Sequence, residues 1–340
     1  MSDFQTVHGF EDVWRPPVRP RRRTPRAILS PGREKAPDAI RARLTRILKR
    51  APEVMVKITG RTRDPGHLRS HLDYISRNGE LELEDRDGAR LTGRAAVREL
   101  ADDWSAMALA DSRRRANTPF SHSVMLSMPA GTDPMAVRDA ARAFAREVFA
   151  DRFDYAFALH TDVEHPHVHL EVRSLGDHGE RLNPKKADLD QWRQVFAQAL
   201  RDRGVEAEAT PRRTRGVTRK ADRMPLRKIA DRHQIAAVQR AAYKEAAQTA
   251  FSSRPARPPW EDRLLERQAR IRSLYLGQAQ ILRRSPHASD RALADQVEAF
   301  VRTMPSPDSR RLALARELRA ANRAVQQEPS TESKDRPKTR

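Results

Sequence analysis

Three histidines on two short apolar segments constrain the fold of this chain more than any other feature. The first segment, 155–160, ends in His160. The second, 167–173, begins with His167 and has His169 two positions later. Side chains two apart in a strand share a face, so His167 and His169 point one way and Val168, Leu170 and Val172 point the other. A loop of six residues joins the segments, and a hairpin would place His160 opposite His167. We therefore expect an antiparallel strand pair with one apolar face and one imidazole face.

The imidazole face is a candidate metal site. Three histidines can converge on one divalent ion and leave coordination positions open, as a catalytic site requires. The chain has no cysteine, so any metal must rest on His, Asp or Glu. Imidazole suits Mn or Zn better than the oxygen shell that Mg prefers, and the sequence leaves the choice among Mn, Mg and Zn open. The alternative is a surface histidine cluster without a metal.

Two loop residues are candidates for groups around these ligands. Asp162 is placed to hydrogen-bond the far nitrogen of a ligating histidine, or to serve as an ordinary turn residue. His165 precedes Pro166, which restricts it to an extended conformation and makes it a poor fourth ligand. We expect it beside the ligands or facing DNA.

The segment from 53 to 207 mixes strand and helix patterns. Val54, Val56 and Ile58 alternate with other side chains as in a half-buried strand, and the apolar stretch 123–128 predicts another strand. Helices are expected at about 66–78, 93–114, 134–150 and 187–203. This mixture predicts an α+β domain, with an antiparallel sheet flanked by helices, followed by a mostly helical C-terminal region.

Composition suggests how the remaining chain is organised. Residues 1–52 are predicted to be a flexible basic arm, because residues 15–23 are dense in arginine and proline. Residues 208–325 read as a basic helical region, and residues 326–340 as a disordered polar tail. The sequence contains neither an apolar run of the ~20 residues that cross a bilayer nor a secretory signal. Together with the lack of cysteine, this predicts a cytoplasmic protein without membrane insertion.

The charge balance points to a polyanionic partner. Sixty-six Lys and Arg against 46 Asp and Glu leave a formal charge of +20, which favours nucleic acid over a small-molecule substrate. Arg77, Arg173 and Lys185, with Arg69 and Lys186, flank the motifs and are candidates for phosphate contacts or for ordinary surface charges. A soluble protein with basic tails is the alternative.

Tyr74 stands on the polar side of a predicted helix. Leu68, Leu72 and Ile75 recur at helical spacing as a buried stripe, and Tyr74 falls outside it. The side chain is expected to be exposed, as a functional group or as a rim tyrosine that caps the core.

Three runs together resemble a known family. They are Leu72 to Leu83, which holds Asp73-Tyr74-Ile75-Ser76-Arg77-Asn78-Gly79, then Val124 to Thr132, and then His160 to His169. In this order they resemble the three motifs of plasmid mobilization relaxases, most closely the branch that includes the T-DNA border endonuclease. The resemblance covers about residues 53–207. The family's tyrosine usually lies nearer the chain start than it does here.

The resemblance implies a relaxase fold and roles for individual residues. Tyr74 would be the nucleophile, the histidines at 160, 167 and 169 would hold a divalent metal, and Ser127 would lie near the DNA backbone beside the nick. The implied activity is site- and strand-specific nicking of single-stranded DNA at a transfer origin, through a 5′-phosphotyrosine, for conjugative transfer. The implied partners are accessory mobilization proteins and a type IV coupling protein.

Other functions use some of the same features. A rolling-circle replication initiator or a transposase would use the same tyrosine chemistry at another DNA site. A non-catalytic basic DNA-binding protein would explain the charge. A zinc hydrolase also fits three histidines with an open position, but the His-Glu-x-x-His signature is absent and the charge favours DNA.

Overall fold

The computed structural model describes residues 4–14, 37–219, 226, 229, 231–232, 234–253 and 257–327. The predicted basic run at 15–23 and the part of the predicted tail from 328 to 340 lie outside the described residues. The described residues fall into two compact units, the first drawn from Met1–Gln5 and Trp14–Pro211 and the second from Thr6–Val13 and Arg212–Arg340. The boundary at 211 lies close to the one predicted at 207.

The first unit contains a six-stranded antiparallel sheet with the strand order β1-β4-β6-β5-β2-β3. Its strands are β1 (Met55–Thr62), β2 (Leu83–Asp85), β3 (Arg90–Leu91), β4 (Ser121–Ser127), β5 (Tyr155–His160) and β6 (His167–Arg173). Its helices are α1 (Pro37–Leu48), α2 (Pro65–Ile75), α3 (Gly93–Ala110), α4 (Pro134–Phe149) and α5 (Lys186–Arg201). The predicted α+β class, with an antiparallel sheet flanked by helices, is confirmed.

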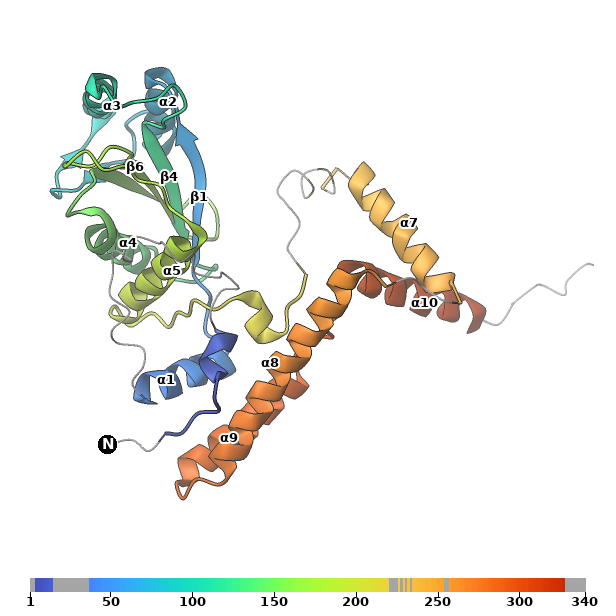
Figure 1. Cartoon of the computed structure of the whole chain (residues 1–340). Helices are drawn as coiled ribbons and strands as arrows, with labels where there is room; N and C mark the ends of the chain where they lie inside the picture. Colours follow the sequence, from blue (N-terminus) through green and yellow to red (C-terminus); the bar gives the residue numbers. More distant parts are fainter. Residues whose placement is uncertain are drawn as a thin grey trace, which may run out of the picture. The chain divides into compact units, whose positions relative to one another are not determined.

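Helices cover both faces of this sheet (Figure 1). One face packs against α4 and α5 in a core that includes Phe144, Trp192 and Phe196, and it receives the apolar side chains of β6 such as Val168. This is the apolar face expected from the alternation in 167–173.

The opposite face, which carries the histidines, is partly covered by α2 and α3. The small side chains of Ala156 and Ala158 on β5 pack into one core with Leu68 and Leu72 of α2 and Trp104 of α3. Nε2 of His160, at the end of β5, donates to the carbonyl of Ile75, at the end of α2, at 2.7 Å. This brings the C-terminal end of α2 to the histidine end of that strand.

Helix α1 departs from the predicted arm. The sequence predicts flexibility over residues 1–52, but residues 37–48 form a helix whose Ile40, Leu44 and Ile47 are buried. These side chains recur at helical spacing, and their burial stabilises a packed helix despite the charged residues among them. Arg46 at the end of α1 is paired with the buried Glu208 at 3.0 Å, so the helix belongs to the first unit.

Strands β2 and β3 were not anticipated. They span only Leu83–Asp85 and Arg90–Leu91, which is too short for an alternating pattern to stand out. Their place in the sheet depends on tertiary contacts, since Glu84 of β2 pairs with Phe157 of β5 and binds Arg142 of α4 at 2.7 Å.

The second unit is mostly helical, as predicted for the C-terminal region. It contains α7 (Ala237–Phe251), α8 (Pro259–Arg283), α9 (Ala288–Arg302) and α10 (Arg310–Gln327), with two short 3-10 helices, η1 (Phe10–Val13) and η2 (Arg212–Arg215). Helix α8 runs beside α9 and α7 beside α10 (Figure 1). Tyr275 of α8 is fully buried between the rings of Phe10 and Phe300, at 5.5 and 5.4 Å. No helix in the described ranges has the length and hydropathy to cross a bilayer.

His122 on β4 predicts how acid affects the first unit. The side chain is 1% exposed, with Nδ1 2.9 Å from Ser174 Oγ. Burial, and then the charge of Arg61, lowers the pKa of His122 from near 6.5 to about 4. The unfolded chain therefore binds this proton more readily, so stability is complete above pH 6.5 and falls as the pH drops toward 4. At 1.36 kcal/mol per pH unit, His122 contributes about 2 kcal/mol to the loss by pH 5. Between pH 7.5 and 5, urea unfolding should therefore show a loss that is about 2 kcal/mol larger in the unchanged protein than in His122→Asn; equal losses would contradict this.

Candidate metal centre and active site

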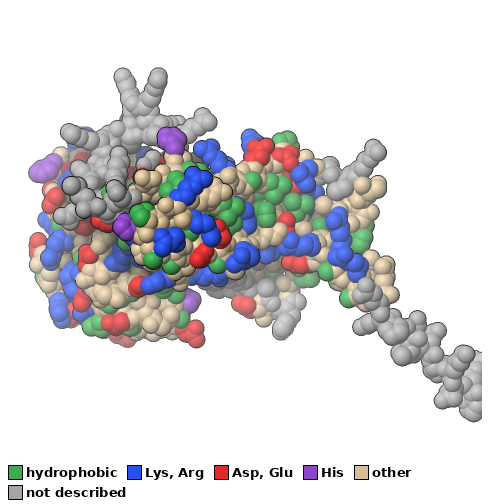
Figure 2. Space-filling model, turned by 90° about the horizontal axis from the view of Figure 1, so that it is seen from below, with side chains coloured by type: hydrophobic (Ala, Val, Ile, Leu, Met, Phe, Trp, Pro, Cys, Tyr) green, Lys and Arg blue, Asp and Glu red, His purple; other side chains and the backbone are tan. Residues whose placement is uncertain are grey.

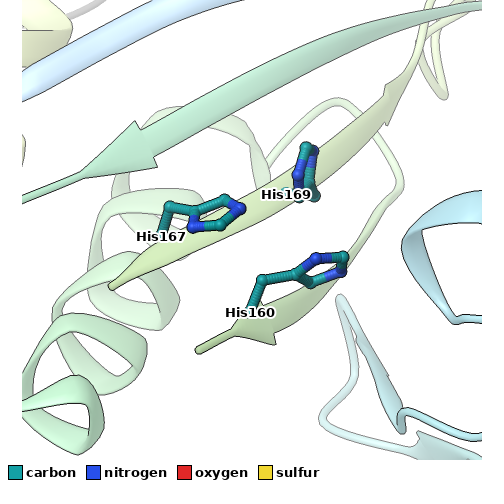
Figure 3. Close-up of side chains that lie close together, drawn as sticks. All are labelled: His160, His167 and His169. Atoms are coloured by element: carbon teal, nitrogen blue, oxygen red, sulfur yellow. The ribbon is translucent and has the colours of Figure 1, made fainter. Parts of the chain in front are cut away.

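The three histidines meet at one end of the β5–β6 hairpin. His160 pairs with His167 across the hairpin, and Ala158 pairs with His169. One nitrogen from each ring lies within 4.8 Å of the others, and the rings project from the same side of the hairpin (Figure 3). The strand alternation therefore brings the three side chains together as expected.

Hydrogen bonds to main-chain carbonyls orient two of the three rings. Nε2 of His160 donates to the carbonyl of Ile75 at 2.7 Å, which leaves Nδ1 with a free lone pair. Nδ1 of His167 donates to the carbonyl of His165 at 3.0 Å, which leaves Nε2 free. Metal-binding histidines commonly fix their tautomer with such a bond on the far nitrogen. The donor set and its spacing fit a divalent ion.

Burial keeps two of these imidazoles neutral. It is the largest cause that lowers the pKa of His169 to about 4, and the nearby His160 and His167 lower it further. Burial also lowers the pKa of His160, against the hydrogen bond to Ile75 that raises it. A neutral imidazole is the form that donates a lone pair to a metal.

Tyr74 lies beside this cluster. As predicted, Leu68, Leu72 and Ile75 are fully buried and the Tyr74 side chain is 63% exposed. Its ring centroid lies 5.8 Å from that of His169 and 6.5 Å from that of His160. The phenol and the imidazoles come from different elements, a helix and a hairpin, and reach the same small region.

The turn after α2 holds Tyr74 in place. Asp64 caps the helix start by accepting from the His67 amide at 2.8 Å, and Ser76 Oγ donates to the carbonyl of Leu72 at 2.8 Å at its end. Two non-glycine residues and then Gly79, at φ +88°, take left-handed conformations. A Cβ at 79 would lie 2.4 Å from the amide nitrogen of Arg94. Only glycine fits this close approach to the start of α3.

The structure separates the two loop candidates, because Asp162 does not hydrogen-bond a histidine of the cluster whereas His165 lies beside it. Asp162 Oδ1 is 3.9 Å from Nδ1 of His160, beyond hydrogen-bond distance, and Asp162 Oδ2 binds Arg77 at 2.8 Å. The far nitrogen of His160 meets the Ile75 carbonyl instead. The side chain of His165 is exposed, and this residue contacts a histidine of the cluster through its backbone carbonyl. A side-chain pattern does not reveal such main-chain partners.

Ser127 and Lys185 lie in different parts of the first unit. Ser127, at the end of β4, pairs with His167 on the neighbouring strand and therefore lies on the imidazole face; it is 5% exposed. Lys185 is exposed and precedes α5, in the helical layer behind the apolar face. The sheet thus places Ser127 next to the histidines and does not bring Lys185 to them.

Arg173 is not available to DNA, contrary to the sequence expectation. Its side chain is 2% exposed, and its guanidinium binds Asp154 at 3.0 Å and Asp177 at 2.6 Å. It lies at the far end of β6 from His167, and its ion pairs hold the following loop. The charge that flanks the motif in sequence is a buried part of the fold.

Arg173→Ala should therefore affect stability. Its removal takes one of two arginine partners from Asp154 and Asp177, which keep Arg86, so the cost should fall at the low end of the about 3–5 kcal/mol typical of a broken buried ion pair. We expect a loss of that size in urea unfolding, while the matched Arg77→Ala, at a side chain 41% exposed, loses about 1 kcal/mol or less. A stable Arg173→Ala protein with weakened DNA binding would reverse this conclusion.

Sequence reasoning missed a buried acidic group on the imidazole face. Glu171 has no exposed surface and its Oε2 lies 3.1 Å from Nδ1 of His71 on α2. Burial lowers the pKa of His71, but the hydrogen bond and charge of Glu171 outweigh it and the pKa is raised. The His71 ring lies 6.2 Å from that of Tyr74. Continuing the alternation of 167 and 169 to 171 would have identified Glu171.

Lys and Arg side chains do not form a single patch on the face of the molecule drawn in Figure 2. Figure 2 shows Lys and Arg side chains spread over that view, with Asp and Glu side chains among them. Many arginines of the first unit are also paired, including Arg69 with Asp102 and Arg86 with Asp154. Net charge alone does not define a DNA path on this face.

The sequence matches a family model and several curated proteins. Residues 74–205 match the model described as relaxase, MobA/VirD2-like, nuclease domain. The T-DNA border endonuclease VirD2 of Rhizobium radiobacter is 31% identical over 208 residues, 52% of this chain and 48% of that protein. VirD2 of Agrobacterium fabrum is 30% identical over 188 residues, 49% of this chain and 41% of that protein. The chain spans about half the length of these relatives.

Solved structures show a weaker likeness. A MobM relaxase domain bound to a 26-nucleotide oriT DNA has a TM-score of 0.36 at 14% identity, covering 50% of this chain and 95% of that one. A structure concerned with vancomycin resistance transfer in Staphylococcus aureus has a TM-score of 0.33 at 14% identity, covering 47% and 99%. The family assignment does not depend on these structures. The sequence match alone shows that residues 74–205 are similar to the relaxase nuclease domain of the MobA/VirD2-like family.

Proposed function

We propose that this protein nicks one DNA strand at a transfer origin by tyrosine transesterification and remains attached to the 5′ end for conjugative transfer. The observation that carries the proposal is the position of Tyr74, whose exposed ring lies 5.8 Å from His169 beside three converging imidazoles. A nucleophile and a potential metal site within one small region are what phosphodiester cleavage needs.

The proposed step exchanges one phosphodiester for another. The phenol oxygen of Tyr74 forms a bond to phosphorus while the bond from phosphorus to the 3′-oxygen breaks. The phenol proton is lost and the leaving 3′-oxygen gains one, so charge and atoms balance. Because a phosphodiester is retained, a 3′-hydroxyl can later displace the tyrosine and rejoin the strand. A tyrosine hydroxyl is a weak nucleophile until its proton is removed, so Tyr74 needs activation.

His160, His167 and His169 would hold a divalent metal. When bound, such an ion would stabilise the charge that develops on the phosphate and orient the scissile bond. The carbonyls of Ile75 and His165 keep two of these rings turned toward the shared region. Tyr74 is exposed, so an extended strand can bring its phosphate to the phenol oxygen.

The proposed substrate is single-stranded DNA at the nick, because the phosphate must approach an open site on a flexible backbone. The match to a MobA/VirD2-like nuclease domain favours a transfer origin over a replication or transposon end. We also propose cytoplasmic action, with accessory mobilization proteins and a type IV coupling protein as partners. The helical region from 208 to 325 is the proposed place for such contacts, separate from the nuclease region at 53–207.

The test is the covalent product itself. Purified full-length protein is incubated with 5′- or 3′-labelled single-stranded oligonucleotides from its own genetic neighbourhood, with Mn²⁺ or Mg²⁺, and resolved under denaturing conditions. We expect a denaturant-resistant adduct that carries the 3′-side fragment, and a released fragment that ends in a 3′-hydroxyl. Nicking of a replication origin in place of a transfer origin would favour the initiator function. Tight DNA binding without an adduct on any oligonucleotide would favour a non-catalytic binding protein.

A further inference from the structure

A row of exposed side chains follows one face of α8, in the second unit. It consists of Trp260, Arg263, Arg267 and Arg270, which recur at intervals of three and four residues. This is the spacing of side chains that lie above one another on a helix. All four side chains are exposed. We call the three arginines the arginine stripe; together with Trp260 they extend about 15 Å along the helix.

The stripe carries positive charge that its surroundings do not neutralise. In the part of the chain that the structure describes, none of its arginines lies within ion-pair distance of a carboxylate. Asp262 is paired with Arg257 at 3.5 Å, and Glu266 pairs with no arginine of the stripe. Arg283, at the other end of α8, has two carboxylate partners at 2.9 Å. A row of uncompensated cations on one helix face fits a polyanion.

Trp260 indicates which polyanion fits. Its side chain is 49% exposed, whereas the other three tryptophans of the chain are at most 5% exposed. A large ring in solvent offers a flat surface on which an unpaired base can stack. Single-stranded nucleic acid exposes its bases as well as its phosphates, and proteins bind it with aromatic rings set beside basic side chains. The stripe and the ring therefore fit a single strand better than a duplex.

Helix α8 is held firmly on its other side. Its Ile271 and Tyr275 are buried, and the helix packs along α9. At the start of α8, the buried Glu261 binds Arg311 and Ser309, which precede or begin α10. Binding along the exposed face therefore orders only side chains, and a backbone fixed in advance lowers the cost of binding.

We propose that Trp260 and the arginine stripe form a second DNA-binding surface, in a different unit from Tyr74, that holds single-stranded DNA without regard to sequence. The arginines contact phosphates along the strand while the ring stacks on one base. At about 3.4 Å per nucleotide, a surface of about 15 Å covers about four nucleotides. This inference rests on the proposed function, because that function makes single-stranded DNA the substrate.

The salt dependence of DNA binding tests the stripe without the covalent step. Full-length protein in EDTA is titrated with a long fluorescent oligo(dT), and anisotropy is measured over a series of NaCl concentrations. Arg263→Ala combined with Arg267→Ala and Arg270→Ala should lower the slope of log K against log salt by about 2, because each lost phosphate contact removes about 0.7. Lysine at the same three positions keeps the charge and should keep the slope.

A second triple variant controls for net charge. Arg284→Ala combined with Arg302→Ala and Arg323→Ala removes the same charge from exposed positions in three separate places of the second unit. It should change the slope by less than about 0.5, and circular dichroism should show that both triple variants remain folded. An equal change in both would mean that only total charge matters and would overturn the proposal. An unchanged slope in the stripe variant would overturn it as well, and would favour an acidic protein as the partner of this face.

Trp260 is tested by comparing a single strand with a duplex. Trp260→Ala should weaken oligo(dT) binding about tenfold through the loss of one stacked base. The salt slope should not change, because the ring carries no charge. Trp260→Phe should recover most of the affinity, and binding of a duplex of the same length should change by about twofold or less. An equal loss with the duplex would refute stacking on an unpaired base.

The surface and the nicking function can fail separately. Covalent adduct formation, together with oligo(dT) binding that none of these variants affects, would reject the surface and leave nicking standing. Binding that depends on the stripe, with no adduct on any oligonucleotide, would reject nicking and leave the surface standing.

Discussion

Tyr74→Phe is expected to abolish the covalent adduct and strand cleavage. The substitution removes only the hydroxyl, and without it the ring has no atom that can attack phosphorus. Loss of an essential nucleophile lowers turnover by about 10³-fold or more, so no adduct should appear under denaturing electrophoresis. Because the side chain is 63% exposed, the free energy of unfolding should change by about 0.5 kcal/mol or less.

DNA affinity separates a chemical role from a binding role at this position. The Phe variant keeps the aromatic ring, so it should bind single-stranded oligonucleotides within about twofold of the unchanged protein, whereas loss of a stacking ring would cost more. Tyr243→Phe, on α7 and 47% exposed, is a matched control that should form adduct normally. An adduct from Tyr74→Phe would show that another residue attacks the phosphate.

Replacement of the clustered histidines is expected to remove both metal binding and cleavage. Even substitutions around metal ligands cost 10- to 100-fold in affinity or activity, so losing a ligand itself should cost at least about 100-fold. We expect His167→Ala with His169→Ala to lose Mn²⁺ binding in calorimetric titration and to form no adduct. EDTA should have the same effect on the unchanged protein, and added Mn²⁺ should reverse it.

Two comparisons make this result specific. His178→Ala removes an exposed histidine in the loop after β6 and should leave Mn²⁺ binding and cleavage unchanged. Circular dichroism should show that the double variant remains folded, since His167 and His169 are only partly buried. Cleavage that persists in metal-free buffer would defeat the metal-centre assignment.

Local patterns predicted much of the site region. The alternation in 167–173 correctly separated an imidazole face from the apolar side chains that now lie under α4 and α5. The helical stripe of Leu68, Leu72 and Ile75 correctly predicted which side of α2 is buried and left Tyr74 exposed. Both predictions succeed because a strand and a helix each repeat over a few residues, so the face of a side chain follows from its position.

Other assignments failed because sequence proximity says little about burial. Arg173 follows the histidine motif closely but is enclosed by Asp154 and Asp177, and both acidic partners come from loops whose courses no local pattern predicts. The main-chain carbonyls that orient the histidines have no sequence signature at all. Helix α1 was misread because its charged residues obscured three buried apolar ones.

The sequence alone determined the α+β class, the hairpin with its imidazole face and the exposure of Tyr74, because each depends on periodicity within one element. The tertiary structure alone decided that α2 packs with Ala156 and Ala158 and that Tyr74 stands beside the histidines. These features depend on how separate elements pack, and packing is governed by the shape and size of side chains that lie far apart in the chain.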